Sequence, residues 1–346
     1  MDIKKCYTDS GFPNFDYIMS YDIPFVVIIG GRGIGKTFSC LKWIIENNKY
    51  FIYMRRTDVQ IETIASDEFN IFTSLNNKLG YHIHCFRSGK NYSCFHTKYE
   101  DNKLLPDGNS IGVLVSLATL SNKRGFSGDK IDILFFDEVI PEKHERVIRG
   151  EDETFQNAYE TINRNRELEN KPPLKCIMTT NSNGINSKIF ASFGIVPVIE
   201  NMKRKNKHIY INASKTLCII DMENSPISAR KKDTVLYKLV AHDSEFYKMA
   251  VDNDFTELEY KARPKNIMEY VPLFSVGKIT IYKHKSKNSY YCSYHRSGNC
   301  EYYSASDIDI KKAKRRYNYI IESYYKNIID FESVSCKVDF EIYFSI

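Results

Sequence analysis

Eight residues near the N-terminus, Gly-Gly-Arg-Gly-Ile-Gly-Lys-Thr at positions 30–37, directly follow five apolar residues at positions 25–29. The apolar run is typical of a buried β-strand, and the Gly-x-x-x-x-Gly-Lys-Thr pattern is typical of a P-loop, which wraps a phosphate chain. Its glycines let backbone N–H groups close around the phosphates, its lysine reaches the terminal phosphates, and its hydroxyl binds Mg²⁺. We therefore predict a site for ATP and Mg²⁺ formed by Gly30, Gly31, Arg32, Gly33, Ile34, Gly35, Lys36 and Thr37.

Further apolar runs predict a sheet around this loop. Strands that alternate with helix-compatible segments indicate an α/β fold, with a mainly parallel sheet covered by helices on both faces. We expect an ATPase domain over residues 1–204, a linker over 205–226 and a smaller α+β domain over 227–346. The expected elements are strands at 50–54, 111–117, 131–136, 175–181, 278–284 and 289–294, a β-hairpin near 81–97, and one long basic helix at about 306–328.

Two adjacent carboxylates, Asp137 and Glu138, end the apolar run at 133–136. Ligands of open α/β sheets bind at the carboxyl ends of the strands. We predict that Asp137 holds the water shell of Mg²⁺ and that Glu138 polarises the water that attacks the γ-phosphate. The second acid favours a motor-type (ASCE-type) ATPase over a GTPase switch. Asn181 ends the next strand, where a polar side chain can contact the γ-phosphate or the attacking water; helix capping is the alternative.

Arginines beyond the P-loop are also candidates for contact with nucleotide. Arg164 and Arg166 follow the helix after the carboxylates, a region that faces the neighbouring nucleotide in ring ATPases. An arginine finger supplied in trans stabilises charge on the transferring phosphoryl group, and we take Arg164 as the first candidate and Arg166 as the second. Arg55 follows the second strand and is a candidate for the nucleotide site, with a salt bridge at the sheet edge as the alternative.

The net charge of +6 over 346 residues is modest, but the basic residues are clustered. Lys123 and Arg124 lie in a glycine-bearing loop that suits contact with a nucleic-acid backbone, which requires charge and no base reading. Residues 311–316, Lys-Lys-Ala-Lys-Arg-Arg, predict a cationic helix. We expect a polyanionic partner, with a solvated surface as the alternative reading of each cluster.

The cysteines, histidines and apolar residues argue against a disulfide-bonded, a zinc-binding and a membrane-spanning protein. Nine cysteines without a Cys-x-x-Cys pair indicate reduced thiols in a cytoplasm. Histidines and cysteines at 82–96 fit the predicted hairpin better than a zinc site. No apolar run of about 18 residues is present, so we expect a soluble protein without a signal peptide or a membrane span.

Five segments resemble, in order and spacing, those of the DNA-packaging ATPases of small short-tailed phages. The resemblance covers residues 20–200 well and the rest by length and layout. One departure is Thr57-Asp58 after the paired arginines, where the family would have a base. The segments are Gly-Gly-Arg-Gly-Ile-Gly-Lys-Thr at 30–37, Phe-Ile-Tyr-Met-Arg-Arg at 51–56, Phe-Phe-Asp-Glu-Val-Ile-Pro-Glu-Lys at 135–143, Arg-Asn-Arg-Glu at 164–167 and Cys-Ile-Met-Thr-Thr-Asn at 176–181.

This resemblance implies a homopentameric ring at the portal vertex of an empty prohead in the host cytoplasm. The ring would work with a packaging RNA and drive double-stranded DNA inward with ATP. It also implies a C-terminal domain like an RNase H nuclease that has lost its metal carboxylates, a vestigial nuclease. By motif, the resemblance assigns nucleotide binding to Lys36 and Thr37, the Walker-B acids to Asp137 and Glu138, the finger to Arg164 and coupling to Asn181.

Two alternatives remain open. A large terminase would also cut DNA, and a competent set of metal-binding carboxylates in the C-terminal domain would support it. A nucleotide-gated DNA-binding module would not hydrolyse ATP, and Glu138 would then be dispensable.

Overall fold

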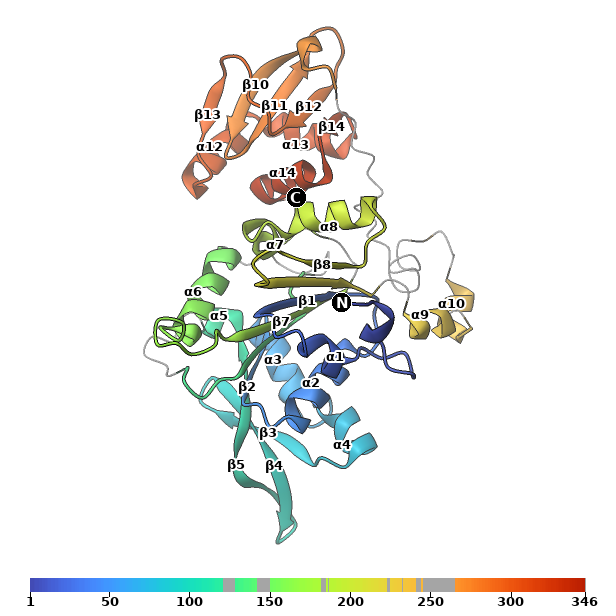
Figure 1. Ribbon diagram of the computed structural model, residues 1–346. Helices are drawn as coiled ribbons and strands as arrows, with labels where there is room; N and C mark the ends of the chain where they lie inside the picture. The colour runs from blue at the N-terminus through green and yellow to red at the C-terminus, as the bar shows by residue number, and fades with distance from the viewer. Residues whose placement is uncertain are drawn as a thin grey trace. The chain divides into compact units, whose positions relative to one another are not determined.

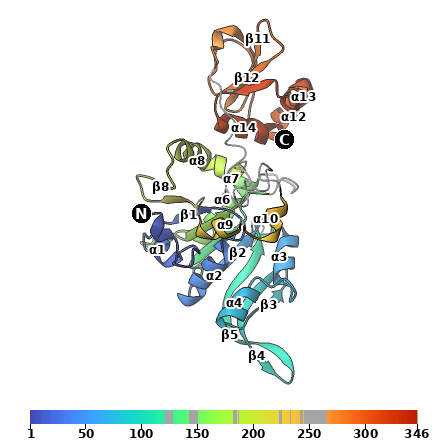
Figure 2. The ribbon, with the colours of Figure 1, turned by 90° about the vertical axis from the view of Figure 1, so that its right-hand side faces the viewer.

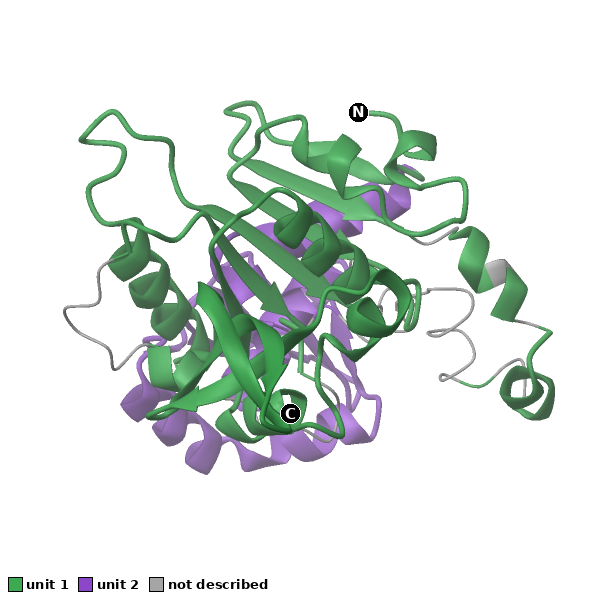
Figure 3. Cartoon of the chain, turned by 90° about the horizontal axis from the view of Figure 1, so that it is seen from below, with its two compact units in different colours: residues 1–183, 206–254 green, residues 184–205, 255–346 purple. Residues whose placement is uncertain are grey.

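The computed structural model describes residues 1–120, 128–141, 150–181, 185, 187–222, 225–231, 233–240, 244 and 265–345. The chain divides into two compact units (Figure 3). We call residues 1–183 with 206–254 the N-terminal unit, and residues 184–205 with 255–346 the C-terminal unit.

The N-terminal unit is built on a nine-stranded sheet in the order β3-β4-β5-β2-β6-β7-β1-β9-β8. The six strands from β5 to β9 in this order pair in parallel, and β3, β4 and β8 add antiparallel pairs at the two edges. The predicted mainly parallel sheet is therefore confirmed. The strands are β1 (Phe25–Ile29), β2 (Phe51–Arg55), β3 (Ile83–Ser88), β4 (Asn91–Glu100), β5 (Lys103–Ser116), β6 (Ile133–Asp137), β7 (Lys175–Thr180), β8 (Ile209–Ile211) and β9 (Leu217–Asp221).

Apolar side chains are buried on both faces of this sheet, which explains why its central strands are continuous apolar runs. Val26 and Ile28 of β1 pack in one core with Leu41 of α2. On the opposite face, Phe136 of β6 packs against Phe155 of α6, with ring centroids 5.7 Å apart. Figure 1 shows where α2 and α6 lie in the ribbon. The helices of this unit are α1 (Phe15–Met19), α2 (Lys36–Glu46), α3 (Asp58–Ala65), α4 (Thr73–Leu79), α5 (Leu117–Leu120), α6 (Glu151–Asn163), α9 (Pro226–Lys231) and α10 (Val235–Leu239), with a short 3₁₀ helix, η1 (Lys4–Cys6).

The predicted hairpin is present as β3 and β4, in which Cys85 lies opposite Cys94. The pairing of β3 ends at His96, whereas β4 and β5 stay paired to Glu100 and Lys103 at their turn. These two strands form a ribbon that projects beyond the rest of the sheet (Figure 2). β5 is longer than predicted because its first half lies in this ribbon, where its side chains are mostly exposed and the sequence lacks an apolar run.

The unit boundaries differ from the predicted domains. The expected linker at 205–226 contains β8 and β9, and β9 pairs in parallel with β1, with Leu217 opposite Phe25. Residues 184–205 carry α7 (Lys188–Ser192) and α8 (Ile195–Arg204) and belong to the C-terminal unit. The Glu200 carboxylate of α8 accepts hydrogen bonds from the backbone N–H groups of Val334 and Ser335, where helix α14 begins.

The C-terminal unit has a five-stranded sheet in the order β13-β10-β11-β12-β14. β10, β11 and β12 are antiparallel, and β13 and β14 pair in parallel with β10 and β12. This is the predicted α+β arrangement; the RNase H-like assignment stays a prediction. The elements are η4 (Ile267–Glu269), β10 (Tyr270–Val276), β11 (Ile279–His284), β12 (Tyr290–Ser293), β13 (Glu301–Tyr303), α12 (Asp307–Arg316), α13 (Asn318–Tyr325), β14 (Ile329–Phe331) and α14 (Val334–Phe344).

The prediction of one long helix at 306–328 is wrong, because the helix is interrupted at Tyr317. The backbone of Tyr317 leaves the helical region, with φ −119° and ψ 39°. Its ring stacks on Phe274 of β10 with centroids 4.0 Å apart, and its hydroxyl donates to Glu301 at 3.1 Å. Packing of this ring against the sheet separates α12 from α13.

Within the described residues, none of the helices combines the length and the apolar character that crossing a membrane requires.

Candidate active site

The P-loop, residues 30–37, connects the end of β1 to the start of α2. Gly33 and Gly35 have positive φ angles of 68° and 85°, a backbone region that favours glycine. A Cβ at Gly35 would also lie 2.3 Å from the ring of Phe12, so a side chain would not fit there. The backbone therefore takes the tight turn that a phosphate-binding loop needs.

Lys36 is buried in this loop, with 8% of its surface exposed. Its Nζ donates to the carbonyl oxygens of Gly30 at 2.7 Å and Gly31 at 2.8 Å, and to Oδ1 of Asn181 at 2.9 Å. Burial lowers the pKa of Lys36 to about 7. The structure thus brings together Lys36 and Asn181, which the sequence predicts as partners in one site, across the ends of β1 and β7.

Asp137 lies at the carboxyl end of β6 and is buried. It accepts hydrogen bonds from Thr37 Oγ1 at 2.7 Å, Tyr53 OH at 2.7 Å and Thr179 Oγ1, and it pairs with Arg55 at 3.0 Å. Burial opposes ionisation, but Arg55 and the three hydroxyl donors outweigh it and hold the pKa of Asp137 below its usual value. The group is therefore a stable carboxylate beside the Thr37 hydroxyl.

Glu138, the residue after β6, has a positive φ of 55°, which is rare for a side chain of this kind. Its carboxylate pairs with Nη1 of Arg55 and its side chain is 39% exposed. Nε of Arg55 donates to Tyr53 OH at 2.8 Å, so the Arg55 guanidinium contacts both carboxylates and the tyrosine. The salt bridge considered for Arg55 is present, and its predicted contact with nucleotide stays a prediction.

The described oxygens fit Mg²⁺. This ion prefers carboxylate, hydroxyl and water oxygens and keeps several of its waters. Thr37 and Asp137 supply one hydroxyl and one carboxylate on adjacent elements, within 2.7 Å of each other.

The two arginines after α6 differ in their surroundings. Nη2 of Arg166 donates to the carbonyl oxygens of Gly128 and Ile131, each at 2.6 Å, so this side chain supports the fold of its own subunit. Arg164, at the C-terminal end of α6, is exposed. The finger role of either arginine stays a prediction. Lys123 and Arg124 lie outside the described residues.

Tyr53 and Thr179 contact Asp137, although the sequence does not mark Tyr53 as functional. Tyr53 lies inside an apolar strand and reaches Asp137 because β2 pairs with β6. Strand order decides this contact, and no local pattern reports it. Thr179 precedes Asn181 in a polar cluster that does mark the end of β7.

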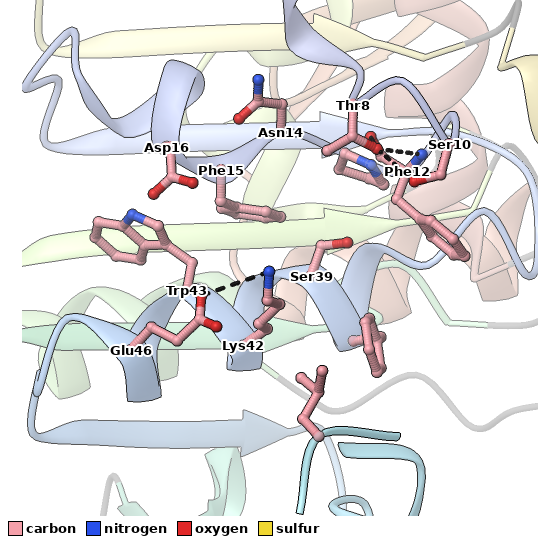
Figure 4. Close-up of a pocket in the computed structure, with 13 residues that line it drawn as sticks. Thr8, Ser10, Phe12, Asn14, Phe15, Asp16, Ser39, Lys42, Trp43 and Glu46 are labelled. Atoms are coloured by element: carbon pink, nitrogen blue, oxygen red, sulfur yellow. Dashed lines mark hydrogen bonds and ion pairs between the residues drawn. The ribbon is translucent and has the colours of Figure 1, made fainter. Parts of the chain in front are cut away.

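A separate hollow of about 260 Å³ lies between residues 8–16 and α2 (Figure 4). Phe12 and Trp43 form part of its wall, and Lys42 pairs there with Glu46 at 3.6 Å. Its lining contains no residue of the P-loop. The hollow is therefore distinct from the P-loop that the sequence predicts as the phosphate site.

A buried ion pair connects the residue after β2 to the first residue of α6. Arg56 Nε and Glu151 Oε1 lie 2.6 Å apart, and each side chain is 1% exposed. We expect Arg56→Met to lower the free energy of unfolding by roughly 3–5 kcal/mol, because it leaves a carboxylate buried without its counterion. Urea unfolding of Arg56→Met, Glu151→Gln and the double variant measures this. The double variant is expected to lose less than the sum of the single losses; strict additivity would contradict the coupling.

The fold and the site define a protein of the P-loop ATPase class: a mainly parallel sheet, a P-loop before α2 and two carboxylates at the end of β6. Within that class, the chain belongs to the podovirus DNA encapsidation protein (Gp16) family, whose model matches residues 7–277. The predicted family resemblance is confirmed, and membership makes this chain a DNA packaging protein.

Comparisons with individual proteins agree with this family assignment. The DNA packaging protein of Bacillus phage B103 is 24% identical over 257 residues, which span 72% of this chain and 70% of that protein. The structure of the Phi-28 gp11 DNA packaging motor matches with a TM-score of 0.63 and 20% identity, over 96% of this chain and 97% of that one. The bacteriophage Phi-29 viral genome packaging motor assembly matches with a TM-score of 0.61 and 19% identity, over 96% and 98%. These two structures show that the fold is shared.

Proposed function

We propose that this chain hydrolyses ATP with Mg²⁺ and uses the cycle to move double-stranded DNA into a prohead. The observation that carries this proposal is that the P-loop, which follows β1, forms hydrogen bonds with residues at the carboxyl ends of β6 and β7. Thr37 of the P-loop donates to Asp137 of β6, and Lys36 of the P-loop donates to Asn181 after β7. A phosphate chain on the P-loop would lie between these groups.

In this mechanism, the P-loop backbone and Lys36 bind the phosphates, and Thr37 and Asp137 would hold Mg²⁺. When bound, Mg²⁺ neutralises charge on the phosphate oxygens. Glu138 orients and polarises the attacking water, for which its carboxylate must leave Arg55. Asn181 accepts a hydrogen bond from Lys36 and is therefore placed to respond to a change in the loop.

The assembly is also a proposal. Two relatives of the same fold are a DNA packaging motor and a genome packaging motor assembly, which supports a ring of copies at a portal, a pentamer by resemblance, working with a packaging RNA. In such a ring, Arg164 acts on the neighbour's nucleotide. Lys123 and Arg124 contact the DNA backbone.

For the C-terminal unit, we propose nucleic-acid binding without cleavage. The basic residues of α12 are partly used within the unit: Arg316 pairs with Glu301, Lys312 pairs with Asp309, and Lys314 donates to Ser345 Oγ at 2.9 Å. Lys311 and Arg315 remain exposed. In the part of the chain that the structure describes, no group of three or more His, Cys, Asp or Glu side chains could hold a metal ion.

We expect the full chain to bind double-stranded DNA or structured RNA with an affinity that falls steeply with salt. Replacing Lys311 and Arg315 with glutamine should lower the slope of log affinity against log salt by about 1–2, because two phosphate contacts are lost. Lys312→Gln, in which the lost lysine is already paired, is the matched control. Nicking of supercoiled plasmid with Mn²⁺ or Mg²⁺, lost on replacement of Asp307 or Asp309, would favour the terminase alternative instead.

An ATP hydrolysis assay of the purified chain, with and without DNA, prohead and RNA, tests the proposal as a whole. Turnover that requires Mg²⁺ and is lost in Lys36→Ala would support it. ATP binding without turnover under all of these conditions would favour the nucleotide-gated binding module.

A further inference from the structure

A second lysine reaches the P-loop from a distant part of the N-terminal unit. Lys231 is the last residue of α9, and its Nζ lies 3.3 Å from the position that a Cβ would occupy at Gly33. Gly33 is in the middle of the loop and Lys36 is at its end. α9 thus adds an ammonium group to a loop that already carries one.

The chain that leads to α9 is held against the P-loop at several points. Met222 N donates to Ile29 O at 2.8 Å, which continues the alignment of β9 with β1 up to the start of the loop. Arg230 Nη2 donates to Ser10 O at 2.6 Å, within the turn of residues 8–12 that Figure 4 shows through Thr8, Ser10 and Phe12. Ser225 Oγ donates to Gly11 O at 3.5 Å in the same turn. The position of α9 beside the loop is therefore specified by contacts of the residues that precede it and of α9 itself.

The surroundings of Lys231 leave its charge without a carboxylate partner in the described part of the chain. Lys231 is half-buried, and among the residues that the structure describes no carboxylate pairs with its Nζ and no acceptor binds it. Burial lowers the pKa of Lys231, and the charge of Lys231 adds to the effect of burial in lowering the pKa of Lys36. Two ammonium groups near one loop repel each other, and an anion bound between them would offset this repulsion.

We propose that Lys231 binds the phosphate chain of the nucleotide in the P-loop, as a second cation in addition to Lys36. This inference rests on the proposed ATPase function and names a residue that acts within it. A lysine is a compact point charge and suits phosphate oxygens. The ligand class is a nucleoside triphosphate or diphosphate, and the recognised part is the phosphate chain.

The test is a titration of the full chain with ATP and with inorganic tripolyphosphate, which carries no base. We expect Lys231→Met to bind both ligands about tenfold more weakly, the effect of losing one charge-assisted contact. Lys231→Arg should stay within about threefold of wild type because it keeps the charge. Lys238→Met is the matched control, since Lys238 is exposed on α10 and should bind like wild type.

Lys36→Ala separates this inference from the proposed function. If wild type binds ATP, Lys36→Ala does not, and Lys231→Met binds like wild type, then only the role of Lys231 is overturned. A loss in Lys231→Met for ATP but not for tripolyphosphate would also overturn it, as would an equal loss in Lys231→Arg. If wild type does not bind ATP, the proposed function and this inference both fail.

Discussion

Glu138→Gln is expected to reduce ATP turnover by about 10²–10⁴-fold while ATP still binds, which is the usual range for loss of a general base. The substitution removes the carboxylate that polarises water and leaves Lys36, Thr37 and Asp137 in place. It also removes the charge that pairs with Arg55, but Arg55 keeps its contact with Asp137. The measurement is steady-state phosphate release together with the dissociation constant for ATP.

The control for this experiment is Glu62→Gln, an exposed glutamate on α3 outside the site, which should hydrolyse ATP like wild type. Turnover near the wild-type rate in Glu138→Gln would show that another group activates the water. Loss of ATP binding in this variant would instead show that Glu138 acts through the nucleotide-binding geometry.

Arg164→Ala is expected to lower turnover in the assembled ring by about 10³–10⁵-fold, the range for removal of an arginine finger. The reason is that Arg164 is exposed at the end of α6 and the family resemblance assigns the finger to it. Rings that mix Arg164→Ala and Lys36→Ala subunits should regain part of the activity. In such rings an intact arginine can meet an intact P-loop across an interface.

An arginine that acts within its own subunit cannot give this rescue. Absence of activity at every mixing ratio, with ring assembly verified, would therefore contradict a role in trans. Lys171→Ala is the control, because Lys171 is exposed in the segment that follows Arg164 and pairs with its sequence neighbour Glu169 at 2.7 Å. It should leave turnover unchanged.

The parts of the fold that the sequence predicts are those with local signals. The P-loop glycines, the apolar run before Asp137 and the polar end of β7 each mark a strand end, and parallel strands bring such ends together. Accordingly, the structure joins the P-loop to both strand ends by hydrogen bonds, from Lys36 to Asn181 and from Thr37 to Asp137.

Features that depend on strand order or on tertiary packing are not predictable from local patterns. Tyr53 reaches Asp137 only because β2 and β6 are neighbours. Lys231 stands between two other basic residues in the sequence, Arg230 and Lys232, and only the structure places it beside Gly33. Tyr317 is compatible with a continuous helix, and its stacking on Phe274 decides the break.

The difference between the predicted linker after residue 205 and the observed strands also results from strand pairing. β8 is three residues long and lies in a polar stretch, so the sequence resembles a linker there. β8 pairs with β9, with Tyr210 opposite Ile219, and this pairing places β8 in the large sheet.

The central claim, that this site converts ATP hydrolysis into DNA packaging, is tested most directly by measuring DNase-protected DNA in proheads together with ATP consumed. We predict that wild type protects DNA in proportion to the ATP hydrolysed, and that Lys36→Ala and Glu138→Gln rings lose both quantities together. Protection of full-length DNA by Glu138→Gln rings without ATP hydrolysis would contradict the dependence of packaging on hydrolysis at this site.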